Sequence, residues 1–359
     1  MKLTVNLVTW NGSKYIPYLF DSLKKQSFKD WKLQVWDNNS EDDTLKLIEN
    51  EASNLGVQTK IYESKDNSGF SGGHNKLYKK TNTDYFAIIN QDIYLPSNCI
   101  HNMVKYLDDH PHITAVAPRL LKWNFNKVAS DPDNNKKSGL HKSFSLKIDS
   151  LGLKVRRNRQ VVDQLSGEIW SNQSKNKMIA KLRSLNNIEV FGLSGALVFY
   201  RKSDIENIVY ENAKLFDESY KSYKEDVDLA YRLRISGRQS VMLLSSVAFH
   251  DRTCERFLND NRISNHRRKA KQSFFVKYYS YKNHLATLYK NEYWQNFILD
   301  FPWILWYELQ KFMYYLFIDR RVLLGLKDLF NSMDFLKKRR SAVNKMKKSN
   351  WRELRRWWM

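Results

Sequence analysis

Acidic side chains stand where predicted strands end, and a carboxylate at such a place can bind a metal ion or a ligand. Asp37 follows the apolar stretch 31–36, and Asp92 follows the stretch 85–90. Asp92 is suited to holding a divalent cation, because hard cations prefer oxygen ligands. Asp37, with Asn39 beside it, is suited to accepting a hydrogen bond from a nucleotide base. The structural alternatives are an Asx turn at Asp37 and a helix cap or turn at Asp92.

A second acidic group lies at the start of a predicted helix. Glu225, Asp226 and Asp228 fall in its first turn, and four acids, Asp217, Glu218, Glu225 and Asp226, lie within ten positions at its start. Carboxylates there are stabilised by the helix dipole, which is the structural interpretation. Such a density of like charge also costs repulsion unless a cation or a substrate offsets it. His250, at the end of the last predicted strand, adds a nitrogen ligand or a proton partner.

Strands and helices alternate along the N-terminal part of the chain. The predicted strands are residues 3–8, 31–36, 59–63 and 85–90. Ser13 is a plausible N-cap for a helix that reaches about Lys25. A glycine-bearing loop at 67–73, whose amides could approach a phosphate, is predicted to precede a helix from about His74. The alternation predicts an α/β fold with a mostly parallel sheet and flanking helices, in which ligands bind at the carboxyl ends of the strands.

The later part of the chain continues this pattern after a long polar insertion at about 122–187. Short strands are expected within the insertion, around 151–162. A strand interrupted by glycine is predicted at 190–200, a helix at 225–236 and a final strand at 241–249. Gly237 follows the helix at the position where a left-handed residue commonly ends one.

Charge is distributed unevenly along the 359 residues, whose net charge is +22. Residues 1–100 balance 12 Lys and Arg against 12 Asp and Glu, whereas residues 251–359 carry 24 against 10. A basic end of this kind indicates contact with a polyanionic surface, either nucleic acid or an acidic membrane. A soluble protein with a basic tail is the alternative.

Aromatic residues concentrate in the same basic region, which we treat as a helical C-terminal part at 256–359 after a domain at 1–255. Charged residues such as Asp300, Glu308 and Lys311 interrupt it, so no uncharged run approaches the ~20 residues of a membrane span. An amphipathic element at a lipid interface fits this pattern. A helical subdomain whose aromatics form its own core fits equally well.

The two cysteines, Cys99 and Cys254, suit neither a disulfide framework nor a thiolate metal cluster, which favours a reducing compartment. The first residues lack the apolar run and cleavage site of a signal peptide. We therefore expect a cytoplasmic protein, peripheral on the inner face of the cell membrane.

Several short motifs follow one another in order along residues 1–255. They are Val8-Thr9-Trp10-Asn11-Gly12, Asp37-Asn38-Asn39-Ser40, the segment 67–75, Asn90-Gln91-Asp92, the segment 192–196, Glu225-Asp226-Val227-Asp228-Leu229 and His250. Together they resemble the inverting family 2 glycosyltransferases of the GT-A fold, close to the bacterial rhamnosyltransferase branch. The resemblance implies transfer of a sugar, such as rhamnose, from a dTDP- or UDP-linked donor to a cell-surface glycan or lipid-linked acceptor.

The resemblance also implies roles for single residues. The residues expected to contact the nucleotide and the rest of the donor are Thr9, Asn11, Asp37, Asn39, Asn67, Phe70, Asn75 and Gly195. Asp92 would hold Mg²⁺ or Mn²⁺ on the diphosphate, and His250 would assist the metal. Asp226 would be the general base, with Glu225 as the alternative.

Two departures and two alternatives accompany this interpretation. Asn90 stands where the metal motif of the fold often has an acid, and the stretch 122–187 is less typical of the family. A nucleic-acid-binding protein is the first alternative, but no base-reading motif is found and the excess charge lies outside the α/β domain, so no nucleic-acid partner is expected. A catalytically inactive relative is the second, and the presence of Asp92, Asp226 and His250 argues against it.

Overall fold

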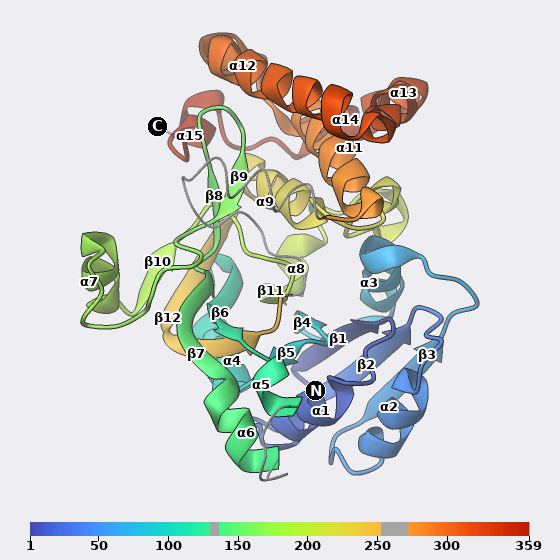
Figure 1. Cartoon of the computed structure of the whole chain (residues 1–359), viewed down its shortest axis with the longest axis vertical. Helices are drawn as coiled ribbons and strands as arrows, with labels where there is room; N and C mark the ends of the chain where they lie inside the picture. The colour runs from blue at the N-terminus through green and yellow to red at the C-terminus, as the bar shows by residue number, and fades with distance from the viewer. Residues whose placement is uncertain (130–135, 253–271, 359) are drawn as a thin grey trace.

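The computed structural model describes residues 1–129, 136–252 and 272–358, and most of its strands join one large sheet (Figure 1). The strands of this sheet are β1 Leu3–Thr9, β2 Trp31–Asp37, β3 Thr59–Glu63, β4 Tyr85–Asn90, β5 Ile93–Tyr94, β6 Ile113–Trp123, β7 Phe144–Ser150, β10 Asn187–Glu189, β11 Leu197–Arg201 and β12 Gln239–His250. Their order is β10-β12-β6-β11-β4-β1-β2-β3, with β5 paired to β12 and β7 to β6. A separate pair consists of β8 Leu153–Val155 and β9 Val161–Asp163.

Helices cover both faces of the sheet, and further helices follow it. Those of the first 252 residues are α1 Ile16–Lys24, α2 Thr44–Ala52, α3 Gly69–Lys80, α4 Cys99–Asp109, α5 Asn126–Ala129, α6 Lys136–Ser143, α7 Lys177–Arg183, α8 Lys202–Ile205 and α9 Glu225–Ile235, with the 3₁₀ turns η1 Glu211–Ala213 and η2 Glu218–Tyr220. Those of the C-terminal part are α11 Phe274–Asn291, α12 Trp294–Ile318, η3 Arg320–Leu323, α13 Leu324–Asn331, α14 Met333–Met346 and α15 Trp351–Arg355.

Alternate residues of the central strands serve two separate cores. In β4, Ala87 and Ile89 pack into the core that α1, α2 and α4 cover, whereas Phe86 and Ile88 pack into the core on the α9 side. This two-sided burial follows from the period of two along a strand and explains why β4 is apolar from Tyr85 to Ile89. The sheet is therefore covered on both faces, as the sequence predicts.

Strand direction brings most carboxyl ends to one edge. β1 runs parallel to β2 and β4, and β2 runs parallel to β3. β11 is antiparallel to both β4 and β6, so β6 and its parallel neighbour β12 run in the direction of β4. The four N-terminal strands are predicted to within a residue, and the GT-A expectation of a mostly parallel sheet is confirmed.

Three local predictions are wrong. Ser13 does not cap α1, because the helix begins at Ile16, next to Pro17, and has no side-chain cap. The strand predicted at 190–200 is confined to Leu197–Arg201. The glycine segment 67–73 is not a loop before a helix at His74, since α3 already begins at Gly69.

Close packing explains the glycines of α3. A Cβ on Gly73 would lie 2.9 Å from both methyl carbons of Val8, and one on Gly69 would lie 2.4 Å from the carbonyl oxygen of Lys221. Gly69 also has a φ of +73°, which favours glycine at the start of the helix. These residues let α3 approach β1 and the 220s loop, whereas their sequence pattern is typical of a loop.

The polar insertion forms the elements from α5 to α7, and β8 and β9 are the short strands expected near 151–162. Gly237 ends α9 as predicted. Its φ is +72°, its N–H donates to Arg234, and the N–H of Arg238 donates to Leu233. Cys99 is buried with a free thiol, and Cys254 lies outside the described residues.

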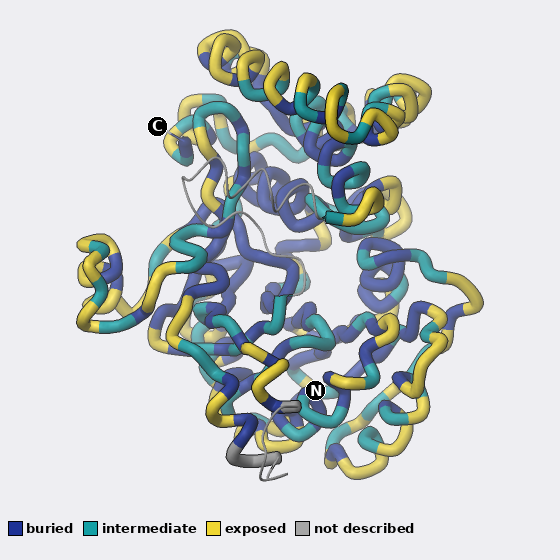
Figure 2. The backbone as a smooth tube through the Cα atoms, viewed as in Figure 1, coloured by how far each residue is buried: buried dark blue, intermediate teal, exposed yellow. Residues whose placement is uncertain are grey.

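The C-terminal helices share a core with the rest of the protein. Val343, Leu354 and Trp358 pack with Val227 and Tyr231 of α9. Figure 2 shows the inner side of this helical part buried and the outer side of α12 exposed. The aromatic region is therefore attached to the sheet domain through α9.

An ionic junction fixes α12 to the remainder of the chain. The Asp300 carboxylate is fully buried and accepts hydrogen bonds from Arg157 at 2.7 Å, Arg159 at 3.1 Å and Arg355 at 2.6 Å. The indole of Trp358 donates to it as well, at 3.2 Å. These contacts lower the pKa of Asp300 to about 2 against the effect of its burial. One carboxylate thus joins α12, the β8–β9 pair and the C-terminus.

Candidate active site

The predicted site residues gather at the edge of the sheet where β1, β2, β4 and β12 end. In register, Thr9 of β1 pairs with Asp37 of β2, and Val8 pairs with Asn90 of β4. His250 at the end of β12 pairs with Ile93 of β5. Strand direction alone therefore brings together residues that are far apart in the sequence.

Asp37 is buried at this edge and holds the ends of β1 and β2 together. Its Oδ1 accepts hydrogen bonds from the hydroxyls of Thr9 at 2.9 Å and Ser40 at 2.6 Å. Its Oδ2 accepts from the backbone N–H of Ser40 at 2.8 Å. The turn anticipated as the structural alternative is thus present, and it leaves Thr9 and Asp37 at the strand ends where a nucleotide is expected.

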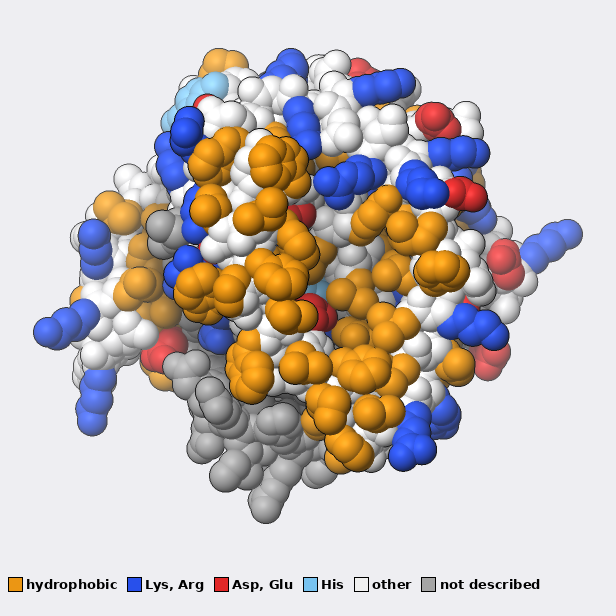
Figure 3. Space-filling view, turned by 90° about the horizontal axis from the view of Figure 1, so that it is seen from above, with side chains coloured by type: hydrophobic (Ala, Val, Ile, Leu, Met, Phe, Trp, Pro, Cys, Tyr) orange, Lys and Arg blue, Asp and Glu red, His pale blue; other side chains and the backbone are white. Residues whose placement is uncertain are grey.

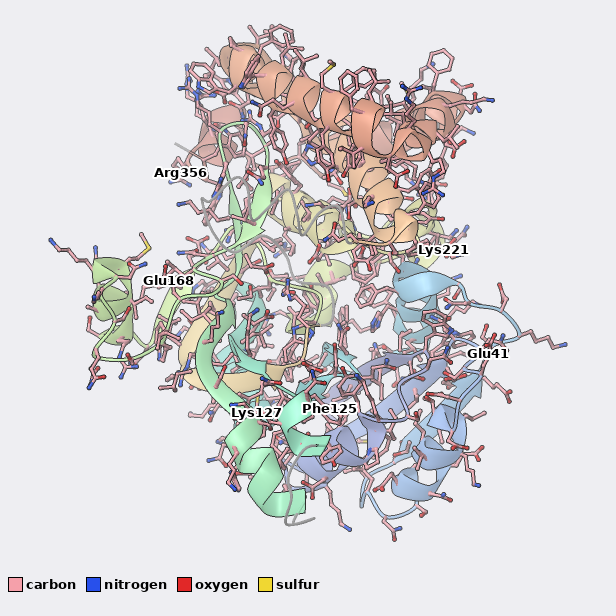
Figure 4. The ribbon with its side chains drawn as sticks, in the orientation of Figure 1. Glu41, Phe125, Lys127, Glu168, Lys221 and Arg356 are labelled. Atoms are coloured by element: carbon pink, nitrogen blue, oxygen red, sulfur yellow. The ribbon has the colours of Figure 1, made fainter. Side chains whose placement is uncertain are left out.

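Asn11 and Asn39 lie in the loops above these strand ends. Both have positive φ, +47° and +62°, which asparagine adopts more easily than most residues. The side chain of Asn11 accepts from the N–H of Glu41 at 2.8 Å, and Asn39 is exposed. Glu41 is labelled in Figure 4, and it marks this end of the site.

Gln91 closes the gap between the β1 and β4 ends, a contact that the sequence alone did not suggest. Its amide accepts from the N–H of Trp10 and donates to the carbonyl of the same residue, both at 3.1 Å. Gly12 lies beneath it, since a Cβ there would fall 2.3 Å from the Gln91 Oε1. Its place within the Asn90-Gln91-Asp92 motif was the available signal.

The first turns of α3 contribute the expected donor residues. Asn67 accepts from the N–H of Gly69 at 2.8 Å, and the ring of Phe70 packs 5.6 Å from that of Phe216. Asn75 is buried and exchanges two hydrogen bonds with the backbone of Phe216, at 2.8 and 2.9 Å. In this structure Asn75 therefore fixes the 216 loop against α3.

Lys221, labelled in Figure 4, lies against the start of α3. Its carbonyl accepts from the N–H of Ser71 at 3.1 Å. The loop between η2 and α9 is thus held at the same end of the molecule as α3.

Asp226 approaches the sheet edge through Gly195. The N–H of Gly195 donates to Asp226 Oδ2 at 3.4 Å, and the next residue, Ala196, accepts from the N–H of Asn90 at 2.9 Å. A Cβ on Gly195 would meet Phe70 at 3.2 Å and Asp226 at 3.6 Å, so glycine allows this approach. Asp226 and its neighbour Glu225 are both largely buried in the first turn of α9.

Asp92 and His250 face each other across the end of the sheet. The Nε2 of His250 lies 3.4 Å from Asp92 Oδ1, and its Nδ1 lies 2.9 Å from Asp149 Oδ2. Burial alone would lower the pKa of His250, but the two carboxylates outweigh it and raise the pKa to about 9. Asp149 was not foreseen, because it lies in the insertion, far from either partner in the sequence.

Arg252 contacts Asp149, the carboxylate that lies against the Nδ1 of His250. It is 3.0 Å from Asp149 and 2.7 Å from Asp163 of β9. Arg252 is therefore a second positive partner for the buried Asp149 carboxylate, whose pKa lies below its ordinary value despite burial. The insertion thus positions His250.

The crowded acids before α9 have an internal cation. Lys290 of α11 is fully buried, with its Nζ 2.7 Å from Asp217 and 3.0 Å from Asp228. The Asp228 carboxylate also accepts hydrogen bonds from Arg232 at 3.1 Å and from Asn291 at 2.9 Å. A cation or a substrate was expected to offset the four acids at the start of this helix. For Asp217, one of the four, the cation is Lys290 of the C-terminal part, which also balances Asp228.

Asp92 and His250 provide a donor set that fits a divalent metal. A carboxylate oxygen and an imidazole nitrogen suit Mn²⁺, and Asp149 on the other ring nitrogen is the arrangement typical of metal-bound histidine. Within the described ranges no group of three or more His, Cys, Asp or Glu side chains is arranged so that it could hold a metal ion by itself. The remaining ligands would therefore have to come from donor oxygens or water.

A sheet with helices on both faces and polar residues at its carboxyl edge defines an open α/β protein, a class in which ligands bind at that edge. Residues 4–152 match the family model described as glycosyl transferase family 2. The N-terminal part of the chain is therefore a family 2 glycosyltransferase domain.

Individual relatives agree with this assignment. The chain is 32% identical over 180 residues to the O-antigen chain rhamnosyltransferase RfbN of Salmonella typhimurium, covering 46% of this chain and 55% of the relative. It is 29% identical over 113 residues to the poly(ribitol-phosphate) beta-N-acetylglucosaminyltransferase TarS of Staphylococcus aureus, covering 31% of this chain and 19% of the relative. The chain thus spans about a fifth of TarS and about half of RfbN.

A solved structure shows the same fold. The crystal structure of GalNAc-T7 with UDP, GalNAc and Mn²⁺ superimposes with a TM-score of 0.54 at 11% identity, over 81% of this chain and 48% of that one. The fold is accordingly the GT-A type that the motifs indicate.

Proposed function

We propose that this protein is an inverting glycosyltransferase that moves a sugar from a nucleotide-diphosphate donor to a hydroxyl of a cell-surface glycan or lipid-linked acceptor. The observation that carries the proposal is the convergence of Thr9, Asp37, Asp92, Asp226 and His250 at one sheet edge. Relatives named for glycosyl transfer, and a neighbour solved with UDP and Mn²⁺, support it.

In the proposed reaction Asp226 accepts the proton of the acceptor hydroxyl. The acceptor oxygen bonds to the anomeric carbon as the bond from that carbon to the diphosphate oxygen breaks, and the nucleoside diphosphate leaves with the electron pair. Thr9 and Asp37 hold the nucleotide end, so that the anomeric carbon is oriented for the attack. A carboxylate within reach of the hydroxyl raises its nucleophilicity at the moment of bond formation.

Asp92 and His250 would hold Mg²⁺ or Mn²⁺, with Asp149 orienting the imidazole. When bound, the metal supplies positive charge that stabilises the departing diphosphate. The carboxylate–imidazole donor pair favours Mn²⁺ over Mg²⁺, because Mg²⁺ prefers an all-oxygen shell.

Replacing Asp226 by Asn tests the base. We expect donor binding to stay nearly intact and turnover to fall by about 10²–10⁴-fold, the usual contribution of a general base. Glu225→Gln is the matched variant on the same helix turn. Full activity in Asp226→Asn would overturn the assignment, and loss confined to Glu225→Gln would move the role to Glu225.

The donor is best identified by thermal stabilisation, because a ligand that binds the native state raises its stability by mass action. We expect a UDP- or dTDP-linked sugar to raise the melting temperature in the presence of Mn²⁺ or Mg²⁺. The resemblance to rhamnosyltransferases makes dTDP-rhamnose the first candidate. A shift that persists unchanged in EDTA would contradict the metal part of the proposal.

We further propose that the C-terminal helices rest on an acidic membrane surface. Over the described part of the chain, no helix has the length and apolar character of a membrane span. In α12 the usual distribution of side chains in a soluble domain, with apolar residues buried and polar residues exposed, is reversed. Asn296, Asp300 and Lys311 lie on its buried side, while its large apolar side chains face outward.

The outward side, which we call the apolar face, is continuous along α12. Its members are Trp294, Phe297, Ile298, Leu299, Phe301, Trp303, Leu305, Trp306, Leu309, Met313, Phe317 and Ile318. Figure 3 shows such side chains gathered at the top of the molecule, with Lys and Arg around them. An apolar face edged by basic residues matches a bilayer that contains acidic lipids.

Point substitutions test this contact better than deletion of residues 290–359, which would remove the buried Lys290. Trp306→Glu and Phe317→Glu place charge on side chains that are 62% and 71% exposed. We expect both to abolish co-sedimentation with vesicles of acidic lipid, whereas Asn54→Asp, near the end of α2, should leave it unchanged. Undiminished binding, or binding displaced equally well by a DNA oligonucleotide, would contradict the proposal.

A further inference from the structure

A cavity of about 510 Å³ lies on the sheet away from the strand-end site. Two arginines, Arg119 of β6 and Arg183 at the end of α7, contribute to its wall. Leu244 also lines it, in the stretch where β12 leaves its register with β6 between Leu243 and Val247. Such a bulge re-aims side chains locally and is common beside binding sites.

The two guanidinium groups are held in place by neutral partners. Trp170 is buried, and the guanidinium carbons of Arg119 and Arg183 lie 5.3 and 5.6 Å from its ring centre. Arg183 also donates to Asn172 at 2.9 Å and to the carbonyl of Trp170 at 3.3 Å, and Arg119 donates to the carbonyl of Leu244. Figure 4 labels Glu168, which lies two residues before Trp170 in the segment that follows β9.

Among the described residues neither arginine forms an ion pair with a carboxylate. The Nε of Arg119 is buried and has no hydrogen-bond acceptor there. Burial, and then the nearby charge of Arg183, lower the pKa of Arg119. The two neighbouring cations repel each other, and the buried N–H of Arg119 lacks an acceptor in the described part of the chain, so both features lower the stability of the folded protein. An oxyanion between the two guanidinium groups would offset the repulsion and accept the hydrogen bond.

We propose that this cavity binds an oxyanion carried by a carbohydrate, such as a sugar phosphate group of a glycan. Arginine forks pair with phosphate or carboxylate through charge-assisted hydrogen bonds. The rest of the wall suits a sugar ring, since Asn172, Asn186 and Ser245 offer polar groups for hydroxyls and the exposed Leu146 and Leu185 offer apolar contact. The site is separate from the proposed transfer site, so either proposal stands without the other.

Calorimetric titration of the full chain with glucose 1-phosphate, in EDTA and at constant ionic strength, tests the proposal. We expect measurable binding that weakens at least tenfold in Arg183→Ala, an exposed position whose substitution leaves the core intact. Arg119→Lys should weaken binding similarly. Lys181→Ala, which removes one positive charge from the same helix outside the cavity, should stay within about twofold of the wild type.

Three further outcomes decide the matter. Equal affinity of wild type and Arg183→Ala, or an equal loss in Lys181→Ala, would overturn the site. Inorganic phosphate is expected to bind several-fold more weakly than glucose 1-phosphate, and equal affinity would overturn the carbohydrate part. Glucose without phosphate should show no binding, and tight binding of glucose would overturn the oxyanion part.

Discussion

Two ionic networks in this protein differ in whether they are fully buried or reach the edge of the sheet. In the first, Lys290 stands between Asp217 and Asp228, and the three side chains are at most 1% exposed. In the second, His250 stands between Asp149 and Asp92, and the Asp92 side chain is 14% exposed. The first network is closed by its own residues, whereas the second reaches the edge of the sheet.

The comparison sets a structural acid beside a proposed functional acid on one helix. Asp228 lies two positions after Asp226, and its charge is balanced by Arg232 and Lys290. Asp226 instead contacts Gly195 at the sheet edge. The acidic motif therefore includes at least one residue, Asp228, whose charge is balanced inside the protein, and the spacing of the motif does not reveal this.

The largest effect should come from opening the closed network. Lys290→Met leaves two buried carboxylates without their cation, and we expect it to destabilise the protein by about 3–5 kcal/mol. Denaturant unfolding monitored by circular dichroism measures the loss. Lys282→Met on the same helix, where the lysine is only partly buried, is the control. Equal losses would show that the ion pairs of Lys290 have no special part.

Weakening the open network should affect metal binding. Asp149→Asn keeps the shape of the side chain but removes the charge that orients His250. We expect Mn²⁺ affinity to fall about 10–100-fold, the usual cost of losing such a partner. Electron paramagnetic resonance of free Mn²⁺ measures it directly. Unchanged affinity in a folded variant would remove His250 from the proposed metal ligands.

Acid should act on the closed network first through Asp217. Desolvation raises its pKa, but Lys290, Ser219 and Arg339 lower it to about 2. A carboxyl with a lowered folded pKa stabilises the native state above its unfolded pKa of about 3.9 and loses this effect as pH falls towards 2. The shift corresponds to about 2 kcal/mol. Unfolding measured from pH 5 to pH 2 should show this slope, and Lys290→Met should flatten it.

The smallest effect is expected at an exposed ion pair that belongs to neither network. Lys25 and Asp21 lie 2.5 Å apart at the end of α1, with side chains 54% and 42% exposed. Lys25→Ala should change the free energy of unfolding by about 0.5 kcal/mol or less. A loss near that of Lys290→Met would mean that burial does not set the scale of these pairs.

The sequence predicts the N-terminal sheet well because its signals are local. Each of β1 to β4 is a short run that contains β-branched, aromatic or other apolar residues and is bounded by turn residues, and both ends follow from the pattern. The start of α3 is different, since Gly73 is required by Val8 of a strand elsewhere in the chain. Composition cannot distinguish a glycine that permits packing from one that breaks a helix.

The site shows the same division. Asp37, Asp92 and His250 are predicted because strand ends share an edge, a rule of parallel sheets. Asp149 is missed because its partner His250 lies 101 positions away in the sequence. Lys290 is missed because its partner Asp217 lies 73 positions away. No periodicity links such pairs, and only the folded chain brings them together.

The junction at Asp300 has a mechanical consequence. One buried carboxylate joins α12 to Arg157, Arg159 and Arg355. The helix is therefore held in a fixed position relative to the β8–β9 pair and the C-terminal residues. A bilayer touching the apolar face would then set the height of the sheet edge above the lipid. An acceptor on a lipid anchor would then have to be long enough to reach the sheet edge from the lipid surface.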